Sequence, residues 1–280
     1  MSHSTVMVIG PTTEAELSDA LAPFDENSEV DPYFSPMSWG LDKRHDDESL
    51  EEFAARLTKE WEEEHFVQDV NGVPTLGTMS TYPPDSKWDW WQIGGRWRGS
   101  LPLKAGVSGG ALGEPGVFDN DVEFEGGVDV ARLGDIDFEL KRTNAESRAK
   151  AAWEQIDEAL DGRFLPPLPR EETREAYQAW WNDPVVEDVM TAIGNQWGMH
   201  PRDLTTMVDD PAAYITHSGK DAVCCFATLH EGEWIEPGAM GWFGMSSDTP
   251  ESRDEYVNKV HELLTTLPDD TMIWVVDYHI

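Results

Sequence analysis

The sequence contains few of the features that mark secreted or membrane-spanning proteins. It has only two cysteines, and these are adjacent, at Cys224 and Cys225. Neighbouring side chains in a strand point to opposite faces, so we expect no internal disulfide and a reducing compartment. The first apolar run is too short for a secretory signal, and no later run approaches the length of a membrane span. We therefore expect a cytoplasmic protein that does not associate with membranes.

Basic residues are also scarce. Twenty lysines and arginines face 55 aspartates and glutamates, which gives a formal charge of −35 and a pI near 4.3. Nucleic acids and anionic membranes both require a cationic surface, so neither is expected as a direct partner. Three explanations of the acidity stay open: a solvated surface that maintains solubility, adaptation to a salty cytoplasm, and imitation of DNA to occupy a DNA-binding protein.

The sequence lacks the strong catalytic motifs, since it has no HExxH, no CxxC and no Walker loop. The sequence therefore leaves any cofactor unknown. Cys224 and Cys225 lie among apolar neighbours, which favours packed thiols over a catalytic nucleophile.

Regular elements are predicted mainly near the two ends of the chain. "STVMVIG" (4–10) predicts a strand, and Thr13 with Glu16 forms a capping box for a helix ending near Leu21. A second capping box, Ser49 with Glu52, precedes a strongly periodic helix that reaches Trp61. Near the C-terminus the sequence predicts a helix over 249–264, with Val257, Val260, His261 and Leu264 on one face, and then a buried strand over 271–280.

Between these ends the pattern is less regular. From 68 to about 137 periodicity fades, with short strands expected in "LKAG", "VEFEG" and "DIDFEL", and so long a loop is uncommon unless it has a function. Helix is predicted over 145–161, with Ala151, Ile156 and Leu160 buried, and a helical pair over 171–194 is interrupted at 183–184. "AAYITHS" and "AVCCFATL" predict two strands joined by 219–221. "HEGEWIEPG" and "AMGWFGMSS" predict further short extended pieces.

Together these elements predict an α+β fold, in which a mixed or antiparallel sheet is packed by helices. We expect a single domain over 1–280, with a helical insertion or subdomain over 145–195 and a long irregular central region rich in tryptophan and glycine.

The stretch "KWDWWQIGGRWRG" (87–99) is the most unusual part of the sequence because it gathers indoles and cations in an acidic chain. Paired glycines permit positive φ, and successive amides there can form an anion nest. A guanidinium suits phosphate and stacks on indole rings. One interpretation is a pocket for a planar, anionic, nucleotide-like ligand; the other is a loop whose indoles only fill a core. The candidate ligand-binding residues are Lys87, Trp88, Trp90, Trp91, Gly94, Gly95, Arg96 and Trp97.

The terminal "VVDYHI" places Asp277 and His279 two residues apart, and hence on one face of a strand. Carboxylate and imidazole at this spacing suit an orienting group and a base, so they are the candidate catalytic pair; a strand-end histidine without function is the alternative. His217 and His230 lie near the ends of predicted strands. With His279 they are candidate metal ligands, although no spacing between them is fixed by the sequence.

Four blocks of the chain resemble an uncharacterised family found mostly in bacteriophages and prophages. They are "KWDWWQIGGRWRG", "LAPFDEN", "MGWFGM" and "VVDYHI". Trp91 departs from the family pattern, in which tyrosine is common at that position. The resemblance implies a phage accessory protein and carries no established activity, so it assigns no catalytic residue.

The sequence therefore predicts a phage-type cytoplasmic accessory protein that binds a small anionic, nucleotide-like ligand. Whether the ligand is only bound or also cleaved is left open, and the expected role is to counter a host defence. The alternative is an acidic protein or DNA mimic that inhibits a host protein without catalysis. "GWFGM" (241–245) is interpreted as core filling at a sheet edge or as a lid over the tryptophan region.

Overall fold

A computed structural model describes residues 3–37, 41–117, 122–170, 173–194, 201–240 and 246–280, and the fold is α+β. The sequence predicts one domain, whereas the contacts divide the chain into two compact units. The larger unit joins Met1–Glu14 to Trp91–Ile280, and the smaller one comprises Ala15–Trp90. "GWFGM" lies outside the described residues.

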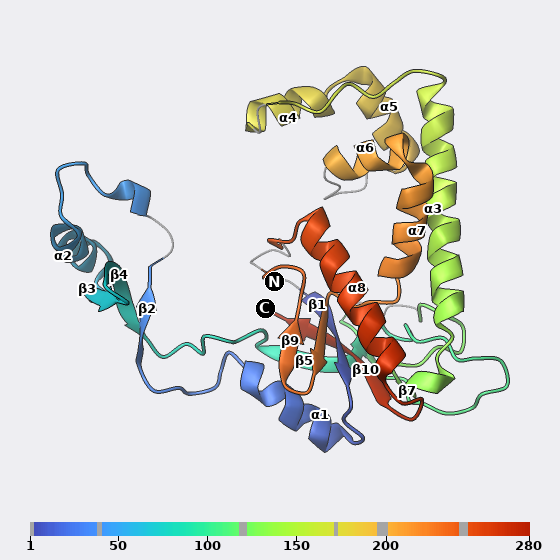
Figure 1. Ribbon diagram of the computed structural model, residues 1–280, viewed down its shortest axis with the longest axis horizontal. Helices are drawn as coiled ribbons and strands as arrows, with labels where there is room; N and C mark the ends of the chain where they lie inside the picture. The colour runs from blue at the N-terminus through green and yellow to red at the C-terminus, as the bar shows by residue number, and fades with distance from the viewer. Residues whose placement is uncertain (1–2, 38–40, 118–121, 171–172, 195–200, 241–245) are drawn as a thin grey trace. The chain divides into compact units, whose positions relative to one another are not determined.

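The larger unit contains a mixed sheet whose central strands are the two ends of the chain. β1 (His3–Ile9) pairs antiparallel with β10 (Met272–His279) and parallel with β8 (Ala227–His230). β9 (Glu233–Ile235) continues the sheet beside β8, and β5 (Trp90–Gly95) with β6 (Glu114–Pro115) continues it on the other side of β10. β7 (Val130–Arg132) also pairs with β10. The N- and C-termini therefore lie side by side (Figure 1).

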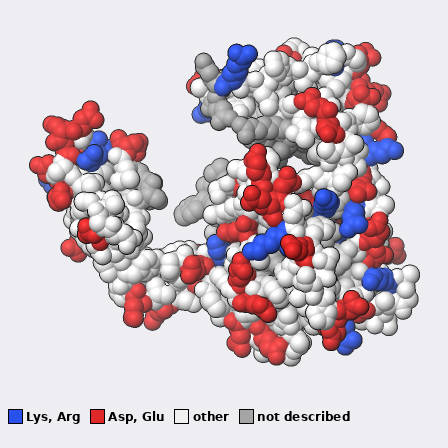
Figure 2. Space-filling view, in the orientation of Figure 1, with Lys and Arg blue, Asp and Glu red and all other residues white. Residues whose placement is uncertain are grey.

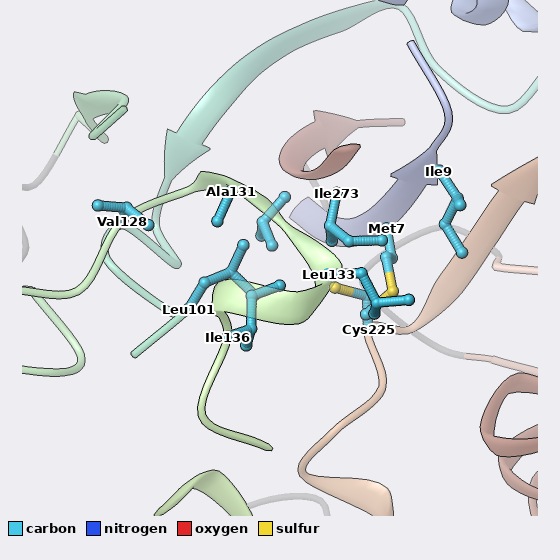
Figure 3. Packing of buried hydrophobic residues seen from close by; sticks show 10 residues of the cluster. Met7, Ile9, Leu101, Val128, Ala131, Leu133, Ile136, Cys225 and Ile273 are labelled. Atoms are coloured by element: carbon cyan, nitrogen blue, oxygen red, sulfur yellow. The ribbon is translucent and has the colours of Figure 1, made fainter. Parts of the chain in front are cut away.

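Both central strands are buried almost continuously, as expected when both faces of a sheet are covered. On the face that carries Met7 and Val275, apolar side chains from the central irregular region pack onto the strands (Figure 3). The cluster consists of Met7, Ile9, Leu101, Val128, Ala131, Leu133, Ile136, Cys225, Ile273 and Val275. The irregular region thus supplies part of the main core, together with a short 3-10 helix, η3 (Leu133–Asp135).

Helices form a second core in this unit. The long α3 (Phe138–Leu160) is followed by α4 (Arg174–Trp181), α5 (Pro184–Ala192), α6 (Pro201–Asp209) and α7 (Pro211–Asp221). Their shared core contains Ile156, Leu160, Trp180, Val186, Val189, Ile193, Leu204 and Met207. α8 (Pro250–Thr266) has a cluster of its own, formed by Tyr256, Val257 and Val260. α7 and α3 run side by side (Figure 1).

The smaller unit is built around a three-stranded antiparallel sheet. β2 (Tyr33–Pro36), β4 (Val73–Ser80) and β3 (His65–Val70) lie in that order, and α2 (Leu50–Trp61) packs on one face of the sheet. Two 3-10 helices, η1 (Ala22–Phe24) and η2 (Leu41–Lys43), also belong to this unit. α1 (Glu14–Leu21) begins at the boundary and buries Leu17 and Leu21.

Most elements near the chain ends are confirmed. β1, α1, α2, α8 and β10 lie within one or two residues of the predicted ranges, and Ser49 with Glu52 forms the expected capping box. The helical pair over 171–194 is confirmed as α4 and α5, and "HEGEWIEPG" contains β9. His261 is only half-buried on α8, where its Nε2 lies 2.9 Å from the carbonyl oxygen of Lys220.

The prediction of a strand in "AAYITHS" is wrong, because this segment lies in the helix α7. Asp210 caps it by accepting a hydrogen bond from the amide of Ala213, and Pro211 occupies the first helical position. The helix packs closely on α3: a Cβ at Gly219 would lie 2.6 Å from Glu146 Cγ. "AVCCFATL" is a strand only in its second half, as β8. The β-branched residues suggested strand, but the capping signals determine the outcome.

The short strands expected in "LKAG", "VEFEG" and "DIDFEL" are also wrong. Leu103 forms only an isolated bridge, with Ile136, and 122–126 has no strand in the part of the chain that is described. "DIDFEL" instead contains the start of α3, where Asp137 caps the helix. α3 therefore begins seven residues before the predicted helix, and it buries Ala145 and Ala149 while Ala151 is exposed.

The hairpin of β3 and β4 lies where the sequence predicts irregular chain. Asn71 and Gly72 both have positive φ, +54° and +83°, as in the two-residue turns that join twisted antiparallel strands. The Asn-Gly pair between two runs containing valine was the signal for this hairpin.

Candidate functional site

The paired glycines of "KWDWWQIGGRWRG" each lie against a buried carboxylate. Gly94 and Gly95 have positive φ, +78° and +57°. A Cβ at Gly94 would lie 2.6 Å from Asp129 Oδ2, and a Cβ at Gly95 would lie 2.2 Å from Asp277 Oδ2. Both aspartates have no exposed surface. The motif therefore uses glycine to admit two buried carboxylates beside the strand β5.

Asp277 belongs to a cluster of polar side chains at the end of the central strands. Its Oδ1 lies 2.8 Å from His3 Nδ1, and its Oδ2 accepts a hydrogen bond of 3.0 Å from the amide of Arg96. The imidazole of His279 meets that of His3 edge to face, with ring centroids 5.1 Å apart and planes at 67°. The side chain of His3 is 12% exposed.

Strand register explains why these residues meet. β1 and β10 pair antiparallel with His3 opposite His279 and Thr5 opposite Asp277. Side chains two apart on a strand share a face, so both histidines and the aspartate lie on one face of the sheet. β5 follows β10 in the sheet and brings Gly95 and Arg96 beside Asp277.

The burial of Asp277 determines how His3 is held. A carboxylate without solvent requires hydrogen-bond donors, and here an imidazole and a backbone amide supply them. When Nδ1–H donates to the carboxylate, the lone pair of the ring is on Nε2. The contact with Asp277 thus holds the ring of His3 in one orientation, and such an arrangement is compatible with an orienting carboxylate and a general base.

Asp129 is held differently, by hydrogen bonds from three backbone amides. Its Oδ1 accepts from the amides of Gly99 at 2.6 Å and Ser100 at 3.4 Å, and its Oδ2 accepts from Gly113 at 2.8 Å. Burial raises the pKa of Asp129, and the three amide hydrogen bonds oppose that shift. Asp129 therefore ties together distant parts of the irregular region, which is a structural role.

The predicted ligand-binding residues are divided between the two units. Lys87, Trp88 and Trp90 belong to the smaller unit. Trp88 is buried and its indole donates to the carbonyl oxygen of Leu21 at 3.1 Å, so this ring fills a core. Trp90 is 42% exposed.

In the larger unit, Trp97 packs against the main core cluster, while Trp91 and Arg96 are half-buried. Amides that follow the paired glycines bind carboxylates of the chain itself, because Arg96 donates to Asp277 and Gly99 donates to Asp129. The glycines thus make room for carboxylates of this protein. Arg96 directly follows Gly95, so its side chain is the cation next to the glycine pair in the sequence.

The three candidate metal-ligating histidines do not converge, so that prediction is wrong. His230 is opposite Ile9 and His279 is opposite His3, at the two ends of β1. Six residues of strand separate these positions by about 20 Å. His217 lies on α7, where its Nδ1 is 2.9 Å from Asp254 Oδ1. Among the residues that the structure describes, no group of three or more His, Cys, Asp or Glu side chains is arranged to hold a metal ion.

Two surface cavities lie away from the motif. One, of about 600 Å³, lies between α7 and α8 and is lined by Asp210, Ala212, Ala213, Thr216, His217, Lys220, Asp254, Val257 and Asn258. The other, of about 290 Å³, is lined by Glu123, Phe124, Asn144, Ser147 and Arg148. Neither cavity contains a residue of "KWDWWQIGGRWRG".

Both cysteines are free thiols, as expected. Burial raises the pKa of Cys225, and it raises the pKa of Cys224 to about 12. Burial thus disfavours the thiolate form of both cysteines, as expected of packed thiols rather than nucleophiles.

The sequence marks Asp277 and His279 as candidates, but it does not mark His3 or Asp129. His3 is the third residue of the chain, and only the pairing of the first strand with the last brings it to Asp277. Asp129 lies in a segment without periodicity, and no local signal marks it.

The described residues include no helix with both the length and the apolar character needed to cross a bilayer. Comparisons of this chain with models of known families, with curated proteins and with solved structures find no match.

Proposed function

We propose that this protein binds a small anionic, nucleotide-like ligand beside the imidazoles of His3 and His279 and cleaves it by acid–base chemistry. The observation that carries the proposal is the 2.8 Å contact between His3 Nδ1 and the fully buried Asp277 carboxylate. A buried carboxylate that orients an imidazole is typical of general-base sites. The second imidazole, 5.1 Å away between ring centroids, supplies a second group for proton transfer.

The chemistry assigns one role to each side chain. Nε2 of His3 removes a proton from a water molecule as the water oxygen bonds to phosphorus. The bond from phosphorus to the leaving oxygen then breaks, and a ring N–H of His279 donates its proton to that oxygen. Asp277 keeps His3 in the required tautomer, and Arg96, whose amide contacts Asp277, supplies a cation for the phosphoryl oxygens.

The resemblance of "KWDWWQIGGRWRG" to a bacteriophage family supports a biological setting for this chemistry. A phage-type accessory protein that binds or removes a nucleotide-like ligand of the host cell would counter a host defence that depends on that ligand.

The test is a substrate panel of nucleoside triphosphates, cyclic mononucleotides and dinucleotides, incubated with the full chain and followed by ³¹P NMR. We expect cleavage of one class, and His3→Gln and His279→Gln to reduce its rate by about 10²- to 10⁴-fold while the protein stays folded. Arg96→Ala is expected to weaken binding of the same ligand in equilibrium dialysis. Binding of no member of the panel, or cleavage by His3→Gln at the wild-type rate, would contradict the proposal.

A second function, inhibition of another protein without catalysis, is favoured by the charge of the smaller unit. Residues 15–90 contain 19 acidic and 5 basic residues. Acidic side chains outnumber basic ones on the molecular face in Figure 2. A complex held by such charge weakens steeply as ionic strength rises, whereas a half-buried ligand is less sensitive. Pull-downs at low and high salt, compared with ligand binding at the same salt concentrations, separate the two functions.

A further inference from the structure

The three-stranded sheet of the smaller unit has one face without charge. α2 packs on the side that carries Leu76 and Val67. Residues directly opposite one another in an antiparallel sheet share a face, so the register defines the members of the other side. We call this side the outer face; it consists of Phe34, Pro36, Phe66, Gln68, Val70, Val73, Thr75, Gly77 and Met79. Six of these nine side chains are apolar and none is ionisable, in a unit where a quarter of the residues are acidic.

Aromatic rings cover the centre of the outer face. The rings of Phe34 and Phe66 lie with centroids 5.4 Å apart. A Cβ at Gly77 would lie 2.7 Å from the ring of Phe34, so glycine leaves room for that ring beside β4. At the two ends of β4, Val73 is 61% exposed and Met79 is 49% exposed. Aromatic residues and methionine with this exposure are typical of the centre of protein–protein interfaces.

The charge around the outer face selects the partner. With 19 acidic and 5 basic residues, the smaller unit repels a second copy of this chain, which carries the same charge. The same charge repels nucleic acid and anionic membranes. In Figure 2, acidic side chains outnumber basic ones on the visible side of the part of the molecule that contains β2, β3 and β4.

We propose that the outer face is a docking site for a basic protein, whose apolar side chains cover Phe34, Phe66 and Met79 while its lysines and arginines meet the surrounding acids. This inference rests on the second function above, interaction with another protein. It is independent of the chemistry at His3. The apolar centre supplies the affinity, and the acidic border sets the charge of the partner.

The experiment selects binders to the full chain from a library of random peptides and then measures their affinity by fluorescence anisotropy. We expect enriched peptides that combine lysine or arginine with aromatic or aliphatic residues. Met79→Asp and Val73→Asp are expected to weaken their binding by about tenfold or more, because each places a charge on the apolar outer face. Both side chains are largely exposed, so both variants should fold.

Phe164→Asp is the matched control, since Phe164 is 89% exposed and lies in the other unit. It should leave peptide binding unchanged, as should His3→Gln, which tests only the catalytic proposal. Enriched peptides that are acidic or uncharged, or basic peptides whose affinity Met79→Asp does not change, would overturn the inference. So would a dimer of the wild-type chain in sedimentation equilibrium that Met79→Asp dissociates. In each of these outcomes a salt-sensitive complex formed elsewhere on the acidic surface would remain possible.

Discussion

Asp277 and Asp129 are two buried carboxylates that lie against the same glycine pair and differ in their partners. Each has no exposed surface, and each lies against a glycine with positive φ in the pair Gly94-Gly95. Their partners differ: Asp277 binds a histidine and one amide, whereas Asp129 binds three amides. An amide cannot change its protonation state, but an imidazole can. Although the two carboxylates are equally buried, their different partners make Asp129 a structural anchor and Asp277 part of a candidate site for proton transfer.

The largest effect on stability is expected from filling the space that the glycines leave for these carboxylates. Gly95→Ala combines positive φ with a Cβ that would lie 2.2 Å from Asp277 Oδ2. We expect it to lower the free energy of unfolding by about 3–5 kcal/mol, measured by urea denaturation. Gly106→Ala is the matched control, because Gly106 has φ +82° and no atom within 4 Å of an added Cβ.

The control should cost only the left-handed backbone conformation of an alanine, about 1 kcal/mol. If Gly95→Ala is no worse than Gly106→Ala, the close approach of Asp277 to the glycine is not a feature of the folded protein.

Exchanging each aspartate for asparagine separates the two roles. In Asp129→Asn the new NH₂ group must face an amide donor, and we expect a loss of about 2–3 kcal/mol in the free energy of unfolding. In Asp277→Asn the NH₂ group can donate to Nδ1 of His3 once that ring carries its proton on Nε2, so a loss of about 1 kcal/mol is expected.

Activity should follow the opposite order. Asp277→Asn leaves Nε2 of His3 protonated and unable to act as a base, so it should slow any cleavage found in the substrate panel by about 10²-fold or more. Asp129→Asn should retain the wild-type rate below its unfolding temperature. If Asp129→Asn and Asp277→Asn each lowered stability and activity to a similar extent, the distinction between a structural anchor at Asp129 and a catalytic site at Asp277 would be lost.

The sequence predicted the elements whose signals are local. The capping box of Ser49 and Glu52 predicts the start of α2, and the apolar run before Asp277 predicts β10. It did not predict contacts that depend on register between distant segments. His3 and Asp277 are 274 positions apart, and no spacing along the chain relates them.

Competing local signals explain the wrong elements. The β-branched residues of "AAYITHS" favour strand, yet Asp210 and Pro211 start a helix there, and that helix can bury its side against α3. In the motif itself, the positive φ that the paired glycines permit is confirmed, and other atoms of the chain lie close to both glycines. The approaching atoms are carboxylates of the same chain, and nothing in the local sequence identifies them.

The smallest expected effect is a pH dependence that belongs to Asp129. Burial raises the pKa of this carboxyl in the folded protein above its ordinary value of 3.8. Between these two pKa values the folded state binds more protons than the unfolded state, so stability decreases as pH rises through this window. The carboxyl of Asp129 therefore opposes the usual gain in stability between acidic and neutral pH. Asp129→Asn removes this contribution without removing the side chain.

The measurement is the difference in free energy of unfolding between the wild type and Asp129→Asn, followed from pH 3.8 upward. The deficit of the variant should be greatest at the acidic end and should shrink as the wild-type carboxyl ionises, because only the wild type loses stability there. A deficit that grows with pH would mean that the three amide donors outweigh burial and lower the pKa of Asp129. Asp129 would then be an ionised anchor throughout, and its contrast with Asp277 would rest on the imidazole of His3 alone.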